Sequence, residues 1–211
     1  MHWNHFVALG DSITASVGDS VPGIESLRWA DRIAHALRRT NPGLRYDNLA
    51  QVGHTTQDVH TRQYPEAAAL RPDLVSILSG GNDVLSPHWS SAQYRGALET
   101  LFRAFRKQGA TVISFTLLNP ASILPARLAA RTCARLEEAH AIIRDLSEQY
   151  QCICVDCWHL ANTHDPRIWS ADRKHPNTLA HQLVAAEVER CLHLATGYPR
   201  ELKGLQERDS G

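Results

Sequence analysis

A serine near the start of the chain and an Asp–His pair near its end are the residues best suited to nucleophilic catalysis. Ser12 follows Gly10 and Asp11, and Asp172 lies three residues before His175. A carboxylate that accepts a hydrogen bond from Nδ1 of a histidine leaves Nε2 free to take the proton of a serine hydroxyl. Gly, Asp and Ser are also frequent turn residues, so each group taken alone could simply be a turn.

Acyl transfer also requires hydrogen-bond donors for the developing oxyanion, and the sequence offers three. Ser12 has its own backbone N–H, Gly53 has no side chain to shield its N–H, and Asn82 carries a neutral side-chain amide. Glycine can equally serve a backbone with positive φ, and asparagine can serve a turn or a helix cap. These residues fall into four segments, at residues 10–12, 53, 80–83 and 172–175, which occur in order along consecutive strand–helix units. This order favours a catalytic site over four unrelated turns.

The elements that must position these groups begin with a short apolar run at residues 6–9. The run stops at Gly10 and predicts a buried first strand. Ser12 then lies just beyond the carboxyl end of that strand, which is the edge of an open α/β sheet where ligands bind. Further strands are expected at residues 44–50, 74–78, 111–115 and 152–155, and the later helices at about 91–108, 127–150 and 177–194.

Strand and helix patterns alternate along the whole chain without a linker or a repeat. Apolar positions from Trp29 to Leu37 recur at helical spacing, and Thr55 or Thr56 is expected to cap the next helix. This alternation predicts one α/β domain over residues 1–197, with a parallel sheet and right-handed crossovers. Residues 198–211 are polar and are expected to form a C-terminal tail.

The four groups of residues together resemble the sequence blocks of the SGNH hydrolases, also called the GDSL esterase/lipase family. Gly10, Asp11 and Ser12 match the nucleophile block, and Gly53 matches the glycine block. Residues 80–83, Gly-Gly-Asn-Asp, match the Gly-x-Asn-Asp block, and residues 172–175 match the Asp-x-x-His block. The resemblance covers most of the chain and implies a three-layer α/β/α, flavodoxin-like fold with a five-stranded parallel sheet in the order 2-1-3-4-5.

The resemblance also implies a role for each matching residue. Ser12 would be the nucleophile, His175 the general base and Asp172 its partner. The oxyanion hole would be formed by the backbone amides of Ser12 and Gly53 and the side chain of Asn82, and no cofactor or metal would be needed. The chain departs from many members in having Ala-His rather than Gly-His at residues 180–181, and Arg-Lys at residues 173–174.

The expected activity is therefore hydrolysis of carboxylic esters through an acyl-enzyme. The loops at residues 13–26, 84–90 and 118–125 mix Pro, Ser, Leu and Trp, which favours a small-molecule ester with a short acyl group over a long lipid. An acyltransferase, a transacylase or a thioesterase would use the same acyl-enzyme. A non-catalytic binding domain on the same fold is the remaining alternative, although it would be expected to lack an intact triad.

Composition narrows the class of protein. The chain has 211 residues, 43% of them hydrophobic, and no formal net charge at pH 7. It therefore shows no basic field that would indicate nucleic acid or an anionic membrane as a partner. The N-terminal residues show neither a secretory signal nor a membrane span, and five cysteines is an odd number, so reduced thiols in the cytoplasm are expected.

Three further groups of residues could bind a metal, replace a triad member or contact the substrate. Cys154 and Cys157 have Cys-x-x-Cys spacing, with Cys152, His159 and His164 nearby, as in some zinc sites, but no second such pair occurs. Asp156, at the end of the fifth strand, could replace Asp172 as the third triad member. His54, His88 and His164 lie on expected loops at the same edge and could contact substrate.

Overall fold

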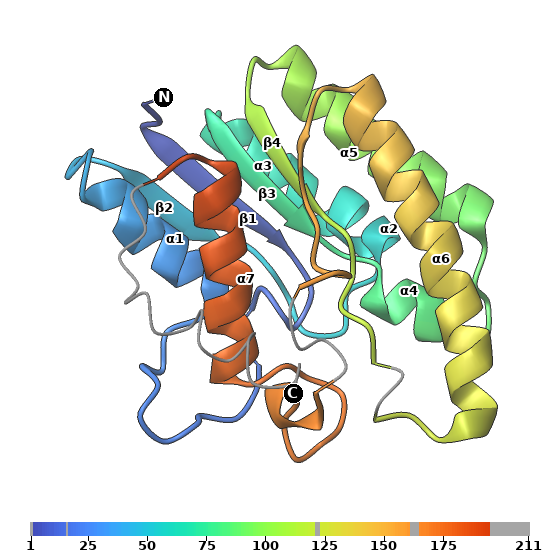
Figure 1. The fold of residues 1–211 in the computed structure, drawn as a ribbon. Helices are drawn as coiled ribbons and strands as arrows, with labels where there is room; N and C mark the ends of the chain where they lie inside the picture. Colours follow the sequence, from blue (N-terminus) through green and yellow to red (C-terminus); the bar gives the residue numbers. More distant parts are fainter. Residues whose placement is uncertain (1, 16, 121–122, 161–164, 195–211) are drawn as a thin grey trace.

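Five parallel strands form the centre of the molecule in the order β2-β1-β3-β4-β5 (Figure 1). The computed structural model describes residues 2–15, 17–120, 123–160 and 165–194. The strands are β1 (His5–Gly10), β2 (Arg45–Asn48), β3 (Leu74–Leu78), β4 (Thr111–Phe115) and β5 (Ile153–Val155). β1 lies between β2 and β3, and its Phe6 is paired in register with Tyr46 of β2 and Leu74 of β3. The expected fold class and strand order are confirmed.

Helices cover both faces of the sheet (Figure 1). One face carries α1 (Trp29–Arg38) and α7 (Thr178–Cys191), which pack against each other. The other face carries α2 (Thr56–Asp58), the π-helical turn η1 (Val59–Gln63), α3 (Tyr64–Leu70), α5 (Ser91–Lys107) and α6 (Ala126–Gln149). Two short helices, α4 (Gly81–Leu85) and the 3₁₀ turn η2 (Pro166–Ile168), complete the described elements. This arrangement follows from right-handed crossovers between parallel strands.

The hydrophobic core lies on both sides of the sheet, because every residue of β1 and β3 is buried. On the α1 and α7 side, the fully buried Trp29 packs edge-on against Phe115, with ring centroids 4.9 Å apart. On the other side, Tyr64 meets the buried Phe105 at 5.3 Å. Strands covered on both faces are expected to be continuously apolar, as residues 6–9 are. The core therefore packs against β1 on both faces of the sheet and fixes the position of its end.

Two local features differ from the sequence expectation. Residues 81–85 form the short helix α4, which the sequence did not indicate, and its last two residues fall within the loop expected at residues 84–90. Residues 59–63 widen into a π-helical turn between α2 and α3. Thr55 caps α2 as expected, in a capping box with Asp58. Both departures lie next to expected site residues.

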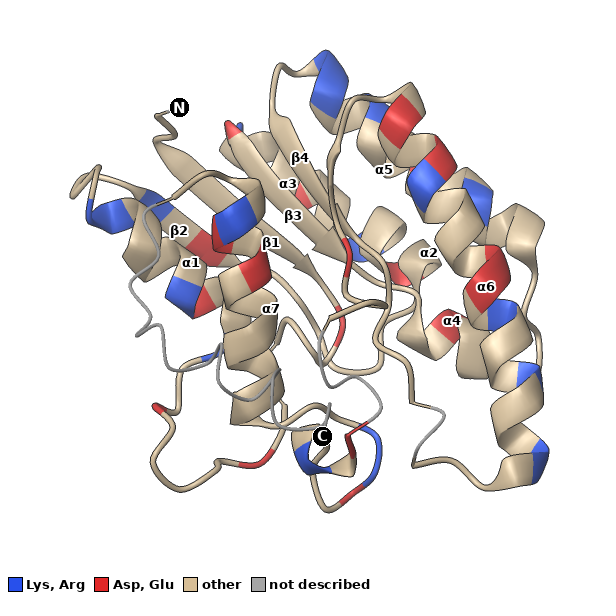
Figure 2. Ribbon diagram, viewed as in Figure 1, with Lys and Arg blue, Asp and Glu red and all other residues tan. Residues whose placement is uncertain are grey.

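Charges of both signs are distributed along the outer helices, as α6 illustrates in Figure 2. Within the described ranges, no helix combines the length and the apolar character needed to cross a bilayer. All five cysteines are free thiols, and Cys157 is buried. The tail expected at residues 198–211 and His164 lie outside the described residues.

Candidate active site

Ser12, His175 and Asp172 form a continuous hydrogen-bonded chain, although Ser12 and His175 are 163 residues apart in sequence. Ser12 Oγ lies 3.0 Å from His175 Nε2, and His175 Nδ1 lies 2.6 Å from Asp172 Oδ2. The bond from His175 is the main cause that lowers the pKa of Asp172 to about 2. Asp172 is therefore an ionised acceptor, so Nδ1 carries the imidazole proton and Nε2 presents its lone pair to the serine hydroxyl.

The end of β1 places Ser12. Gly10 has a φ of +149°, and a Cβ there would lie 2.1 Å from the Leu78 carbonyl oxygen of the neighbouring strand. Only glycine fits this close approach. Directly afterwards, Asp11 Oδ1 accepts a hydrogen bond from the Ile13 N–H at 3.0 Å, which shapes the turn that carries Ser12.

The loop after β1 is attached to the loop that carries His175. The Asp19 N–H donates to Ser170 Oγ at 2.9 Å, and the Asp19 carbonyl accepts from the Thr178 N–H at 3.0 Å. The Asp19 carboxylate also accepts from the Ala171 N–H at 2.8 Å. These bonds join two segments about 150 residues apart in sequence, and they hold the His175 loop next to the loop that follows Ser12.

The start of α7 anchors the other side of the His175 loop. Asn177 caps the helix by accepting from the N–H groups of Leu179 and Ala180 at 3.0 and 3.3 Å. Its Nδ2 donates to the Arg167 carbonyl at 2.6 Å. His181 is buried within this helix, and burial lowers the pKa of His181 to about 4. The Ala-His departure from the Gly-His pattern therefore leaves a well-capped helix start.

The three expected oxyanion donors come from three neighbouring segments at the carboxyl edge of the sheet. Gly53 is exposed and has a φ of +80°, with no atom within 4 Å of an added Cβ, so its glycine serves the backbone conformation. Asn82 Nδ2 donates one hydrogen to the His54 carbonyl at 2.9 Å, which leaves its second hydrogen available. In the described part of the chain, no group accepts a hydrogen bond from the N–H of Ser12 or of Gly53.

A buried carboxyl group, Asp11, and a half-buried one, Asp83, lie close to each other near Ser12. Burial raises the pKa of Asp11 to about 7, and the nearby Asp83 adds to this rise. Burial also raises the pKa of Asp83. Asp83 accepts from the Thr56 N–H at 2.9 Å and from its hydroxyl at 3.1 Å, which ties α4 to α2. Asp83 therefore holds the segment that carries Asn82.

Asp156, the alternative triad member, has other partners. Its carboxylate accepts from the Thr116 hydroxyl at 3.0 Å and lies 2.8 Å from His159 Nδ1. Burial alone would raise the pKa of Asp156, but the hydrogen bonds from His159 and Thr116 outweigh it and lower that pKa to about 2. The structure brings Asp172, and not Asp156, to His175.

The described members of the expected zinc set, Cys152, Cys154, Cys157 and His159, do not form a metal site with other described residues. Among the described residues, no group of three His, Cys, Asp or Glu side chains is arranged to hold a metal ion. His88 is exposed on the loop after α4. His54 is half-buried, and its Nδ1 lies 2.9 Å from Nε2 of Gln63, a residue that the sequence did not single out.

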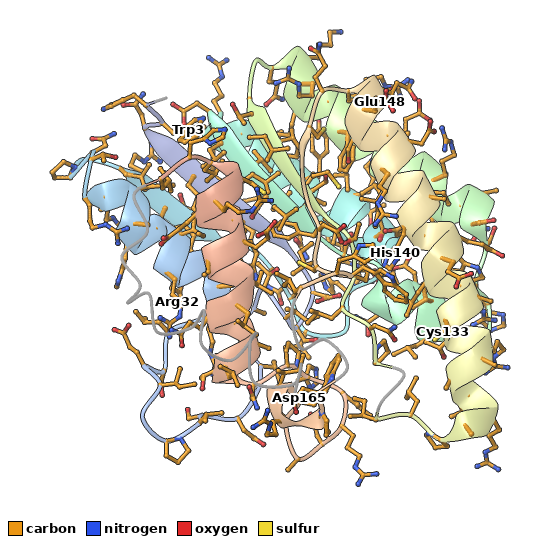
Figure 3. The ribbon with its side chains drawn as sticks, in the orientation of Figure 1. Trp3, Arg32, Cys133, His140, Glu148 and Asp165 are labelled. Atoms are coloured by element: carbon orange, nitrogen blue, oxygen red, sulfur yellow. The ribbon has the colours of Figure 1, made fainter. Side chains whose placement is uncertain are left out.

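His140 is a further histidine in the interior, and its role is structural. It projects from α6 towards the centre of the molecule (Figure 3). Its Nε2 accepts the Leu117 N–H at 3.0 Å, just beyond β4. Burial lowers the pKa of His140 to about 4, so the ring stays neutral and keeps this acceptor.

A cavity of about 590 Å³ opens beside the site, between the α2 segment and the loop that leads into α5. Asp83 and Trp89 are among its lining residues, whereas Ser12 and His175 are not. The loop at residues 84–90 therefore lines a cavity that extends to Asp83, whereas its expected place along the substrate site stays a prediction.

Comparison with known proteins places this geometry in a family. The model of the GDSL-like lipase/acylhydrolase family matches residues 8–183. No curated protein matches the chain.

Solved structures share the fold over nearly the whole chain. LAE5, an alpha/beta hydrolase enzyme from the metagenome of Lake Arreo in Spain, is 25% identical, with a TM-score of 0.72 and coverage of 90% of this chain and 95% of its own. A catalytic mutant of Axe2, an acetylxylan esterase from Geobacillus stearothermophilus, is 21% identical, with a TM-score of 0.75 and coverage of 93% and 97%. TesA is 23% identical, with a TM-score of 0.72 and coverage of 90% and 98%.

The family model spans most of the chain, and it includes Ser12, Gly53 and Asn82 together with the Asp172–His175 pair. The chain belongs to the GDSL-like lipase/acylhydrolase family and is a carboxylic ester hydrolase.

Proposed function

We propose that Ser12, His175 and Asp172 are the catalytic triad of an esterase that acts on small esters with short acyl groups. The contact between Ser12 Oγ and His175 Nε2, at 3.0 Å, carries this proposal. It is the hydrogen bond that lets a histidine activate a serine. Support also comes from Axe2, because its catalytic mutants replace a serine, an aspartate and a histidine by alanine.

In the first step, Ser12 Oγ attacks the ester carbonyl carbon while His175 Nε2 takes the hydroxyl proton. Asp172 accepts the Nδ1 hydrogen and stabilises the imidazolium that forms. The tetrahedral oxyanion is bound by the N–H groups of Ser12 and Gly53 and by the free amide hydrogen of Asn82. Removing one such donor typically costs about 10²–10³-fold in kcat.

The intermediate then collapses, the bond to the alcohol oxygen breaks, and His175 returns its proton to the departing alcohol. Water attacks the acyl-enzyme next and gives its proton to the same nitrogen. The second collapse releases the carboxylic acid and restores the Ser12 hydroxyl. The preference for a short acyl group is supported by the acetylxylan esterase activity of Axe2 and by the mixed Pro, Ser, Leu and Trp composition of the expected substrate loops.

Hydrolysis of p-nitrophenyl acetate, butyrate and octanoate by the wild type and by Ser12→Ala tests this function. We expect Ser12→Ala to lose at least about 10⁴-fold in kcat, and kcat/KM to fall with acyl length. Circular dichroism checks that the variant is folded. An equal rate in the two proteins would refute the nucleophile. Ester formation with an added alcohol, at the expense of free acid, would indicate a transferase instead.

A further inference from the structure

The side chain of Gln63 joins the end of β1 to the loop that carries Gly53. Gln63 is the last residue of η1, and it is buried, with 3% of its surface exposed. Its Oε1 accepts the Gly10 N–H at 3.0 Å, and its Nε2 donates to the Gly10 carbonyl at 2.7 Å. The same Nε2 lies 2.9 Å from His54 Nδ1. One amide therefore connects the residue two before Ser12 with the residue directly after Gly53.

The two hydrogens of the Gln63 side-chain amide determine which nitrogen of His54 carries the imidazole proton. Both hydrogens of Gln63 Nε2 are used, one on the Gly10 carbonyl and one on His54 Nδ1. Nδ1 is therefore an acceptor, and the imidazole proton lies on Nε2. Because Asn82 Nδ2 donates to the His54 carbonyl at 2.9 Å, His54 is held through both its ring and its backbone.

These contacts fix the relative positions of the three proposed oxyanion donors. The Ser12 N–H follows Gly10, and the Gly53 N–H lies in the loop that His54 and Gln63 hold. Asn82 is bonded to that same loop. A second link, from the Gln51 N–H to the Gly10 carbonyl at 3.2 Å, ends at the same residue of β1. An oxyanion hole works only when its donors are held close to their productive geometry.

We propose that Gln63 is a positioning residue, which holds the Gly53 loop against the end of β1 and so keeps the oxyanion donors aligned. This inference rests on the proposed roles of Ser12, Gly53 and Asn82. The π-helical turn places Gln63 for this contact, and π-bulges in helices occur frequently at functional sites. Gln63 itself is separated from the reacting atoms by the residues that it holds.

The test compares Gln63→Met, which has a similar length and no hydrogen-bonding amide, with Gln57→Met on the preceding helix. Gln57 is exposed and serves as the matched control. For Gln63→Met we expect kcat on p-nitrophenyl acetate to fall about 10–100-fold, with KM within threefold, because a misplaced donor costs less than a missing one. The Ki of a trifluoromethyl ketone, which forms an oxyanion on the serine, should rise by a similar factor.

His54→Phe removes the acceptor of Gln63 at a half-buried position and provides a second, independent variant. It should lower kcat at least about fivefold and weaken the trifluoromethyl ketone in parallel, with its melting temperature unchanged. A folded Gln63→Met or His54→Phe enzyme with kcat and Ki within twofold of wild type would overturn the inference. Ser12→Ala, assayed alongside, separates the two failures: if it is inactive, only the role of Gln63 is refuted, and if it is active, the proposed function is refuted.

Discussion

The molecule contains two Asp-x-x-His pairs with the same local geometry, one at residues 156–159 and one at residues 172–175. In both, one carboxylate oxygen faces His Nδ1, at 2.8 Å for His159 and 2.6 Å for His175. In both, the other oxygen accepts the histidine's own N–H, at 3.2 and 3.1 Å. The pKa of each aspartate is lowered to about 2.

The pairs differ in what lies at the far nitrogen of the imidazole. His175 Nε2 meets Ser12 Oγ, and the His175 side chain is only 20% exposed. The His159 side chain is 66% exposed, and no described side chain hydrogen-bonds to its Nε2. A tight turn alone is thus enough to orient a histidine by a carboxylate. The proposed catalysis depends on the loop after β1, which places Ser12 at His175 and not at His159.

The largest expected effect comes from replacing each histidine by alanine. His175→Ala should lower kcat on p-nitrophenyl acetate by at least about 10⁴-fold, because it removes the base that activates Ser12. His159→Ala should leave kcat within about twofold. Thermal melting of both variants shows that they are folded. Similar losses in the two would mean that the comparison is wrong.

Replacing the aspartates should produce a smaller difference in kcat between the two pairs. Asp172→Asn is expected to lower kcat on the order of 10³–10⁴-fold, because the amide favours the wrong imidazole tautomer. Asp156→Asn should leave kcat within a few-fold, since its carboxylate serves Thr116 and His159. Steady-state kinetics on the purified variants measures both values. A large loss in Asp156→Asn alone would restore it as the triad member.

Asp156→Asn should instead reduce stability, in a pH-dependent way. A carboxyl whose folded pKa is lowered contributes stability above its unfolded pKa, about 4, and loses it as the pH falls through the folded value of about 2. The difference in urea midpoint between wild type and Asp156→Asn should therefore be largest near pH 6 and shrink towards pH 2. A difference that is constant with pH would contradict this.

The triad pair also has a buried carboxyl beside its nucleophile. The pKa of Asp11 is raised to about 7, so the folded state binds more protons than the unfolded state between about pH 4 and 7, and stability falls as the pH rises through that range. From pH 5 to pH 8, the wild type should lose about 3 kcal/mol more than Asp11→Asn, at about 1.4 kcal/mol per pH unit. Urea denaturation at both pH values measures this. Equal losses in the two proteins would count against a raised pKa.

The smallest effect is expected from replacing a residue that lies between the aspartate and the histidine of a pair. Arg173 is exposed and has a φ of +52°, whereas Cys157, at the equivalent place, is buried. Arg173→Gly should relieve the left-handed backbone and change the free energy of unfolding by less than about 1 kcal/mol, with kcat unchanged. Chemical denaturation and a kcat measurement test this together. A tenfold loss of kcat would show that Arg173 acts on the substrate.

Much of the fold was predictable because its signals are local. The apolar run at residues 6–9 and the capping box at Thr55 reflect interactions within a few residues. The strand order came from the resemblance to a family. The helix at Asn82 was missed because its two preceding glycines are weak helix formers, and the bonds from Thr56 to Asp83 that hold it are non-local.

In the candidate site, too, the residues that lie in local patterns were predictable, and the contacts between distant residues were not. Ser12, Gly53, Asn82, Asp172 and His175 were recognisable because each follows a strand or precedes a helix in a distinctive motif. The Asp-x-x-His pattern alone does not separate residues 172–175 from residues 156–159, because the difference is a contact over 163 residues, and the choice of Asp172 and His175 came from the resemblance to a family. Gln63 gave no signal, because a single glutamine on a helix does not indicate a bond to a strand 53 residues away.

The bonds of Asp19 to the His175 loop have a consequence for synthesis. Ser12 is synthesised more than 150 residues before Ser170, Ala171 and Thr178, which hold the His175 loop in place. Domains fold as units during synthesis. In the proposed mechanism, the nascent chain therefore carries Ser12 without its base until the His175 loop and α7 have been made and α7 has packed beside α1.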